Sequence, residues 1–139
     1  MMNMMSTQMM VGIMIVSSLL STMTVWADKL SDIRWSLNDL YMSLLMSGWM
    51  VLFMGMYDKN KKTIILGIVF IVAAFICIRK QIFVNESQFY KGMIPHHSMA
   101  VHMSKELIKK NGNMGSTEFA QSIINNQNRE IDWMKQKLL

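Results

Sequence analysis

The sequence contains little of what a soluble or disulfide-stapled protein needs. Only 17% of its 139 residues are charged, and it has one cysteine, Cys77, and one proline, Pro95. An average soluble domain carries about 25% charged residues. With a single cysteine the chain is not a disulfide-rich secreted module, and its high apolar content excludes long intrinsic disorder. Its basic residues form no run with interleaved aromatic residues, so we expect no nucleic-acid partner.

Apolar residues make up 52% of the chain, and 18 of its residues are methionine. They concentrate in three stretches at residues 9–27, 40–57 and 63–79. Crossing a bilayer as a helix takes about 20 consecutive apolar residues, so each stretch is a candidate transmembrane helix. We therefore expect a methionine-rich lead-in at residues 1–8, a membrane region over residues 9–80, and the lipid bilayer as a partner.

The first stretch has a second interpretation as a cleaved signal peptide. No Lys or Arg precedes it, and Trp26-Ala27-Asp28 is a weak cleavage site, so we favour a retained helix. Three lysines in residues 58–62 indicate that this turn is cytosolic and that the C-terminal tail is extracytoplasmic. Arg79 and Lys80 argue for the opposite orientation.

The tail, residues 85–139, is more polar, and its apolar residues recur at helical spacing. Asn85 can cap a first helix that runs to about Lys110, and a second helix follows from about Thr117 to Leu138. The expected fold is therefore all-α, with three transmembrane helices followed by a C-terminal αα-hairpin.

Histidine and methionine share one face of the first tail helix. At 100° per residue, an arc of about 120° on this helix contains Phe89, Met93, His96, His97, Ala100, Met103 and Leu107. A similar arc on the second helix contains Ala120, Ile123, Ile124, Gln127, Glu130, Ile131, Met134 and Leu138. Packing the two faces together would bury imidazoles, thioethers, an amide and a carboxylate in one seam.

Such a seam is either an internally satisfied polar network or a metal site, because buried polar groups need partners. Thioether sulfur favours Cu(I), and imidazole accepts copper in both oxidation states. The tail has no cysteine, and no His follows a Glu at the spacing used by di-iron bundles. The alternative is that the methionines fill the seam as apolar groups while the histidines make hydrogen bonds.

Two stretches carry a family resemblance: Met93-Ile-Pro-His96-His97-x-x-Ala100-x-x-Met103, and Gln127-x-x-Glu130-Ile131-x-x-Met134. They resemble the domain of unknown function 305 family, which is grouped with ferritin-like helical folds and has copper-binding, copper-resistance members in the bacterial cell envelope. The resemblance implies that the hairpin is half of a four-helix bundle. It further implies the metal ligands Met93, His96, His97, Met103 and Met134, with Gln127 and Glu130 behind them. Met99 and His102 are accessory candidates, and many members have an aliphatic residue at the position of His102.

The expected function is a membrane-anchored protein of the cell envelope that sequesters or buffers copper, with Cu(I) favoured. The alternative is a structural or interaction module of the membrane without a metal. Ser98 follows His97 in the sequence but faces away from it on a helix, so it is not placed as a nucleophile, and we expect no enzyme. A hairpin is too small to bury much core alone, which favours a homodimer through the hairpin. A stripe of Met42, Met46, Met50 and Met54 in the second span would either pass a soft cation or serve as an apolar packing face.

Overall fold

The computed structural model describes residues 7–110 and 113–139. Within these residues the regular elements are all helices, and there are no strands. The helices are α1 (Thr7–Leu20), α2 (Leu37–Tyr57), α3 (Lys61–Lys80), α4 (Glu86–Lys109) and α5 (Met114–Lys137). Two short 3-10 turns, η1 (Met23–Trp26) and η2 (Leu30–Asp32), lie between α1 and α2. The all-α expectation is confirmed. Most of the expected lead-in and the turn at Asn111 and Gly112 lie outside the described residues.

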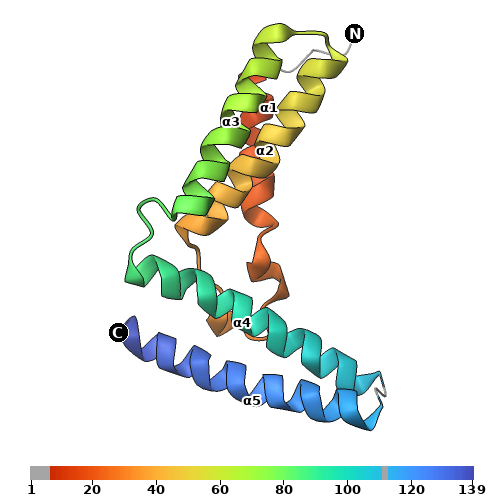
Figure 1. Ribbon diagram of the computed structural model, residues 1–139, viewed down its shortest axis with the longest axis vertical. Helices are drawn as coiled ribbons and strands as arrows, with labels where there is room; N and C mark the ends of the chain where they lie inside the picture. Colours follow the sequence, from red (N-terminus) through yellow and green to blue (C-terminus); the bar gives the residue numbers. More distant parts are fainter. Residues whose placement is uncertain (1–6, 111–112) are drawn as a thin grey trace. The chain divides into compact units, whose positions relative to one another are not determined.

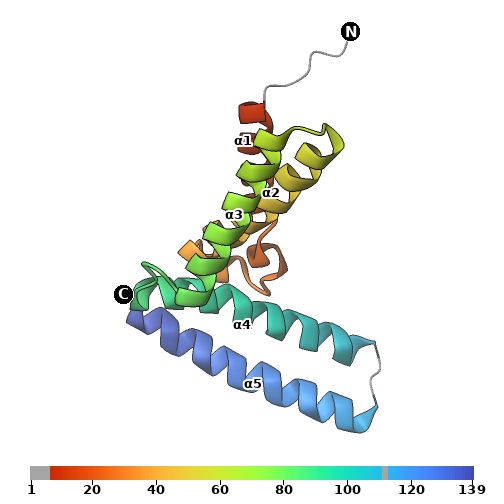
Figure 2. The same cartoon turned by 45° about the horizontal axis from the view of Figure 1, so that its top comes forward.

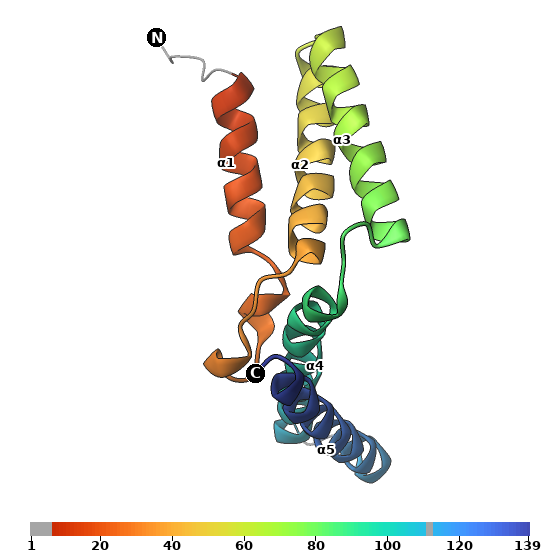
Figure 3. The same cartoon turned by 90° about the vertical axis from the view of Figure 1, so that its left-hand side faces the viewer.

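The chain forms two compact units. Unit 1 contains α1, α2 and α3, and unit 2 contains residues 23–36 together with residues 84–139. Within unit 1, α2 packs along α3, and α1 lies beside α2 (Figure 3). Three segments are long and apolar enough to cross a membrane: Met9–Trp26, Leu37–Tyr57 and Lys61–Lys80.

The first apolar stretch is a shorter helix than the sequence predicts. The expectation of a continuous helix over residues 9–27 is wrong beyond Leu20, where α1 ends. Ser21 donates its backbone N–H to the carbonyl of Ser18 at 3.1 Å, closing the last turn tightly. Ser and Thr compete with the helix for backbone groups, and both occur at this point of the chain. The residues that follow, Met23–Trp26, belong to unit 2.

Small residues allow the close packing of α2 against α3. Four of the six buried positions of α2 recur every four residues and lie on one side of the helix: Ser43, Ser47, Val51 and Gly55. Gly55 and Gly67 have no side chain between the two backbones, and Gly48, which is also buried, lies against Ile71. Small residues are the usual means of bringing membrane helices together.

The methionine stripe of α2 does not lie on this packed side. Met42, Met46 and Met50 are each between 44% and 49% exposed, and Met54 is partly buried. Three of the four thioethers therefore belong to an outer apolar surface of unit 1.

A substitution at Gly67 is expected to force α2 and α3 apart. A Cβ atom there would lie 2.6 Å from the backbone nitrogen of Leu52. Gly67→Ala should lower the free energy of unfolding of unit 1 by about 1–3 kcal/mol, the usual cost of overpacking. Gly12→Ala is the matched control, because a Cβ at Gly12 meets nothing within 4 Å. Thermal melting of the full chain in detergent measures both, and equal melting temperatures would contradict the prediction.

Unit 2 is built on the antiparallel pair α4 and α5, which run side by side in Figures 1 and 2. Asn85 caps α4 as predicted, with its side chain accepting the N–H of Gln88 at 2.9 Å. Helix α5 begins at Met114, earlier than the expected Thr117, because Asn113 caps it by accepting the N–H of Ser116 at 2.8 Å. The hydrophobic core between the helices consists of Tyr90, Ile94, Val101, Ile124, Ile131 and Met134.

The buried side of α4 is rotated from the one the sequence predicts. Its buried residues are Tyr90, Ile94, Pro95, Ser98, Val101 and Ser104. Four members of the expected arc are instead exposed: Phe89, His96, Met103 and Leu107. On α5 the prediction is largely confirmed, since Ala120, Ile124, Ile131 and Met134 are buried, but Glu130 is exposed. The rotation arises because residues 23–36 cover a second side of α4.

Candidate metal site and the segment that supports it

Segment 23–36, which joins α1 to α2, is anchored to the two hairpin helices by buried polar contacts. Asp32 is only 2% exposed. It accepts a hydrogen bond from the hydroxyl of Ser98 at 2.6 Å and forms an ion pair with Lys135. Asp28 forms a second ion pair, at 2.6 Å, with Lys105. Asp32 thus connects the segment to both α4 and α5, and Asp28 adds a second contact with α4.

The charge of Asp32 is stabilised in place. Burial by itself raises the pKa of this carboxyl, but the hydrogen bonds from Lys135 and Ser98 and the charge of Lys135 outweigh it, and the pKa lies below its ordinary value of 3.8. Asp32 is therefore ionised at neutral pH although it is buried. Ser98 also accepts the backbone N–H of Asp28 at 2.9 Å, so both of its hydrogen-bonding roles are used.

The sequence does not predict this network, because residues 23–36 fall within the expected membrane region over residues 9–80. Ser98 and Lys105 are seven residues apart and so share one side of α4, away from the predicted arc. In a sequence, a polar side opposite an apolar arc is typical of a solvent-exposed face, so no signal indicated that a third element covers it.

His97 is the most constrained histidine. Its side chain is 13% exposed, and its Nδ1 is buried without a hydrogen bond. Glu130 Oε2 lies 3.0 Å from Nδ1, a distance typical of an ion pair, but the angles are not those of a hydrogen bond. Burial lowers the pKa of His97, the charge of Glu130 opposes this in part, and His96 adds to the lowering. The ring is therefore neutral at pH 7 and keeps a lone pair.

Two predicted thioethers lie near the same seam. Met134 of α5 is 4% exposed and belongs to the hydrophobic core, and Met93 of α4 packs against that core. Met93 precedes His97 by four residues, which places the two side chains on one side of α4. Gln127 is partly buried on α5. Met93, Met134, Gln127 and His97 thus all lie at or beside the seam between α4 and α5, and we call them the inner group.

The other predicted residues lie on the outside of α4. His96 is exposed, Met103 is 55% exposed, and Met99 is partly buried. His96, Met99 and Met103 are spaced by three and four residues and so share one side of the helix. The rings of His96 and His97 are 6.0 Å apart between centroids. His102 is partly buried and points to another side.

One chain does not bring all five predicted ligands to a single ion. Met93 and Met103 are ten residues apart, which is about 15 Å along the helix axis. Among the described residues, no three His, Cys, Asp or Glu side chains are grouped as a metal site.

Comparison with known proteins gives two matches. The model of the family described as domain of unknown function (DUF305) matches residues 80–138. An uncharacterized protein of Acanthamoeba polyphaga mimivirus is 40% identical over 124 residues, which is 86% of this chain and 82% of that protein. No solved structure matches this chain. The chain thus belongs to the family of this viral protein, and its residues 80–138 match the model of the domain of unknown function 305.

Proposed function

We propose that this protein is a membrane-anchored copper-binding protein that sequesters or buffers the metal, with Cu(I) favoured, at a site on the α4–α5 hairpin. The observation that carries the proposal is the imidazole of His97, which is neutral, largely buried and without a hydrogen bond at Nδ1. A buried polar group without a partner is costly in a folded protein. A metal at Nε2 would account for keeping it, because the ring proton would then be on Nδ1, beside the carboxylate of Glu130.

The groups around His97 suit a soft ion. Met93 and Met134 supply thioethers, which are favoured by Cu(I) and are poor ligands for hard ions. Glu130 lies beside Nδ1 at 3.0 Å and would orient the ring when Nε2 holds the metal. In this arrangement the inner group supplies one imidazole and two thioethers, and Gln127 supports it from α5.

The outer residues support a homodimer. Phe89, Met103, Leu107, Phe119 and Trp133 are each between 43% and 67% exposed on the two helices of unit 2. Because only about half of each side chain is exposed, these five residues supply part of the roughly 800 Å² per partner that a standard interface buries. Packing two hairpins together would complete a ferritin-like four-helix bundle and place His96, Met99 and Met103 near the bundle axis. Sedimentation of the solubilised full chain as a strict monomer would contradict this.

The membrane part of the proposal has three spans, with the hairpin extracytoplasmic as the lysines of residues 58–62 indicate. Retention of the first segment is supported by Thr24, which is 8% exposed within unit 2. Cleavage after Ala27 would remove Met23–Trp26, which packs against α4. The chain would then lose part of the unit that carries the site.

The second candidate is a structural module of the membrane without a metal and without enzymatic activity. It is favoured by the separation of the predicted ligands along α4. In that case His97 would serve only the packing of the hairpin.

Titration of the full chain in detergent with Cu(I), against a chromophoric competitor, distinguishes the two candidates. We expect the wild type to compete and the His96→Ala/His97→Ala variant to lose at least about tenfold in affinity, or about 1.4 kcal/mol. His102→Ala is the matched control and should retain the affinity. Affinity should also fall between pH 7.5 and pH 5, because protons compete for imidazole. Absence of competition by a folded wild type would favour the structural module.

A further inference from the structure

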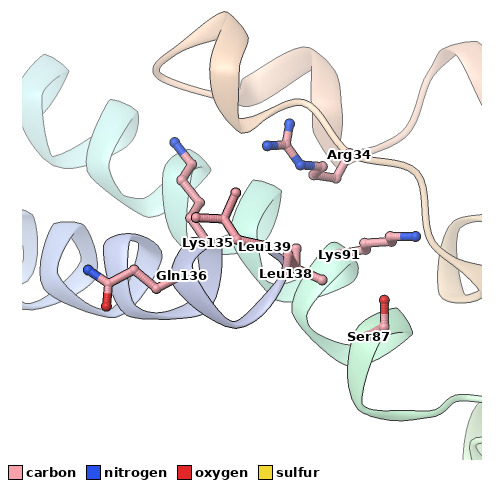
Figure 4. A pocket seen from close by; sticks show the side chains of 7 residues that line it. All are labelled: Arg34, Ser87, Lys91, Lys135, Gln136, Leu138 and Leu139. Carbon is pink, nitrogen blue, oxygen red and sulfur yellow. The ribbon is translucent and has the colours of Figure 1, made fainter.

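Unit 2 contains a pocket that does not include any of the histidines. It has a volume of about 480 Å³ and is lined by Arg34, Ser87, Lys91, Lys135, Gln136, Leu138 and Leu139 (Figure 4). These residues come from segment 23–36, from the first turns of α4 and from the end of α5. Three cationic side chains and no acidic side chain line it.

The positive charge of the pocket is not neutralised. Lys135 is paired with Asp32, but Lys91 has no hydrogen bond or ion pair within the described residues. Arg34 donates from one guanidinium nitrogen to the backbone carbonyls of Ser31 and Ile33, each at 2.9 Å. These bonds hold the guanidinium in place and leave its other N–H groups free. The pocket therefore has an excess of two cations and fits an anion.

The mixture of lining groups fits a phosphate ester better than a simple ion. A guanidinium presents paired donors that match phosphate oxygens, and a lysine adds a point charge. The hydroxyl of Ser87 is a further donor, whereas the amide of Gln136 lies on the far side of the pocket from Ser87 and Lys91 in Figure 4. Leu138 and Leu139 lie between Lys135 and Lys91 in Figure 4 and offer an apolar surface beside the charges. Such a surface would suit the glycerol and first methylenes of a lipid.

The chain itself keeps part of the pocket near the ends of the proposed spans. Arg34 precedes the first residue of α2 by three residues, and Ser87 follows the last residue of α3 by seven. At no more than about 3.5 Å per residue, these distances are at most about 10 Å and 25 Å, whatever the arrangement of the two units. Basic pockets between membrane helices on the cytoplasmic side bind anionic lipid head groups, and the same chemistry is open to a basic pocket beside the spans on either side of a membrane.

We propose that this pocket binds the phosphate of an anionic phospholipid at the membrane surface. The proposal rests on the membrane anchoring proposed above and is independent of copper. Arg34 and Lys91 hold the phosphate, and the two leucines contact the glycerol backbone. The bound lipid would fix unit 2 to the membrane surface.

Native mass spectrometry of the full chain, released from vesicles of phosphatidylcholine with 20% phosphatidic acid, tests the proposal. The wild type should retain phosphatidic acid in preference to phosphatidylcholine. Arg34→Gln/Lys91→Gln should reduce the retained phosphatidic acid at least about tenfold. The control variant Lys29→Gln/Lys110→Gln removes the same charge from two exposed sites, one in segment 23–36 and one at the C-terminal cap of α4. This variant should retain phosphatidic acid as the wild type does. Equal losses in both variants, or no loss in the first, would overturn the proposal.

Two further measurements separate the other outcomes. Lys91→Gln alone removes no side-chain hydrogen bond or ion pair within the described residues, so it should weaken retention even if the Arg34 substitution disturbs folding. Inorganic phosphate at millimolar concentration should displace little phosphatidic acid. Full displacement would show that the ligand is free phosphate and would overturn the lipid assignment. A chain that fails to float with neutral vesicles would contradict the membrane anchoring, whereas one that floats without lipid preference would contradict the pocket alone.

Discussion

Asp32→Ala is expected to lower the free energy of unfolding of unit 2 by about 2–3 kcal/mol. The substitution leaves the hydroxyl of Ser98 and the ammonium of Lys135 without their shared acceptor in a place from which water is largely excluded. Removing one partner of a fully buried ion pair costs about 3–5 kcal/mol. The side chain of Lys135 is 28% exposed, so water recovers part of that cost. Helix loss on heating, followed by circular dichroism of the solubilised full chain, measures the change.

Two variants control this experiment. Asp132→Ala removes an exposed carboxylate from the same helix as Lys135, and its melting temperature should match the wild type. Asp32→Asn keeps an acceptor for Ser98 but removes the charge that pairs with Lys135, so its stability should be intermediate. If Asp32→Ala and Asp132→Ala have the same melting temperature, then the contacts of segment 23–36 do not stabilise the hairpin.

The pH dependence of the wild type should follow the same contact. Because the pKa of Asp32 is lowered on folding, the unfolded chain binds the proton more tightly than the folded one. The stabilisation is complete above about pH 3.8, the ordinary value of the group, and is lost as the pH falls below it. The Asp32→Asn variant should lack this loss. A peptide of residues 84–139 alone lacks Asp32, and so the full chain is the proper sample for binding studies.

The sequence predicted α5 well because one rule decides its packing. Ala120, Ile124, Ile131 and Met134 recur at helical spacing and face α4, and no other described element competes for that face. On α4 the same rule failed. Two elements cover this helix, so Ser98 and Ser104 are buried beside Val101, whereas apolar Met103 is exposed. Apolar spacing alone cannot show that a distant segment will supply a carboxylate to a buried serine.

The candidate site divides in the same way. Periodicity placed Met93 and His97 on one side of α4, and both lie at the seam with α5. Periodicity placed His96 and Met103 in the same arc, but both are exposed, and their surroundings depend on what packs against the outside of the hairpin. A single sequence gives residue types and their directions around a helix, but not the second copy that would cover them. For this reason the outer residues of the site belong to the dimer proposal.

His97→Leu is expected to separate function from stability. Leucine fills a similar volume and removes a buried nitrogen without a hydrogen bond, so the variant without metal should be as stable as the wild type or up to about 1 kcal/mol more stable. With Cu(I) at one hundred times its dissociation constant, the wild type should gain about 2.7 kcal/mol and the variant almost none. The order of the two melting temperatures should therefore reverse when metal is added.

Acid should affect the two proteins differently as well. The pKa of His97 is lowered on folding, mainly by burial, so the folded chain resists protonation more than the unfolded one. The stability of the wild type is complete above the ordinary pKa of 6.5 and should fall as the pH drops below it, whereas the His97→Leu variant should lack this loss. A variant that is less stable than the wild type at pH 7.5, together with a wild type that gains nothing from Cu(I), would assign His97 to packing. The structural module would then be the function of the hairpin.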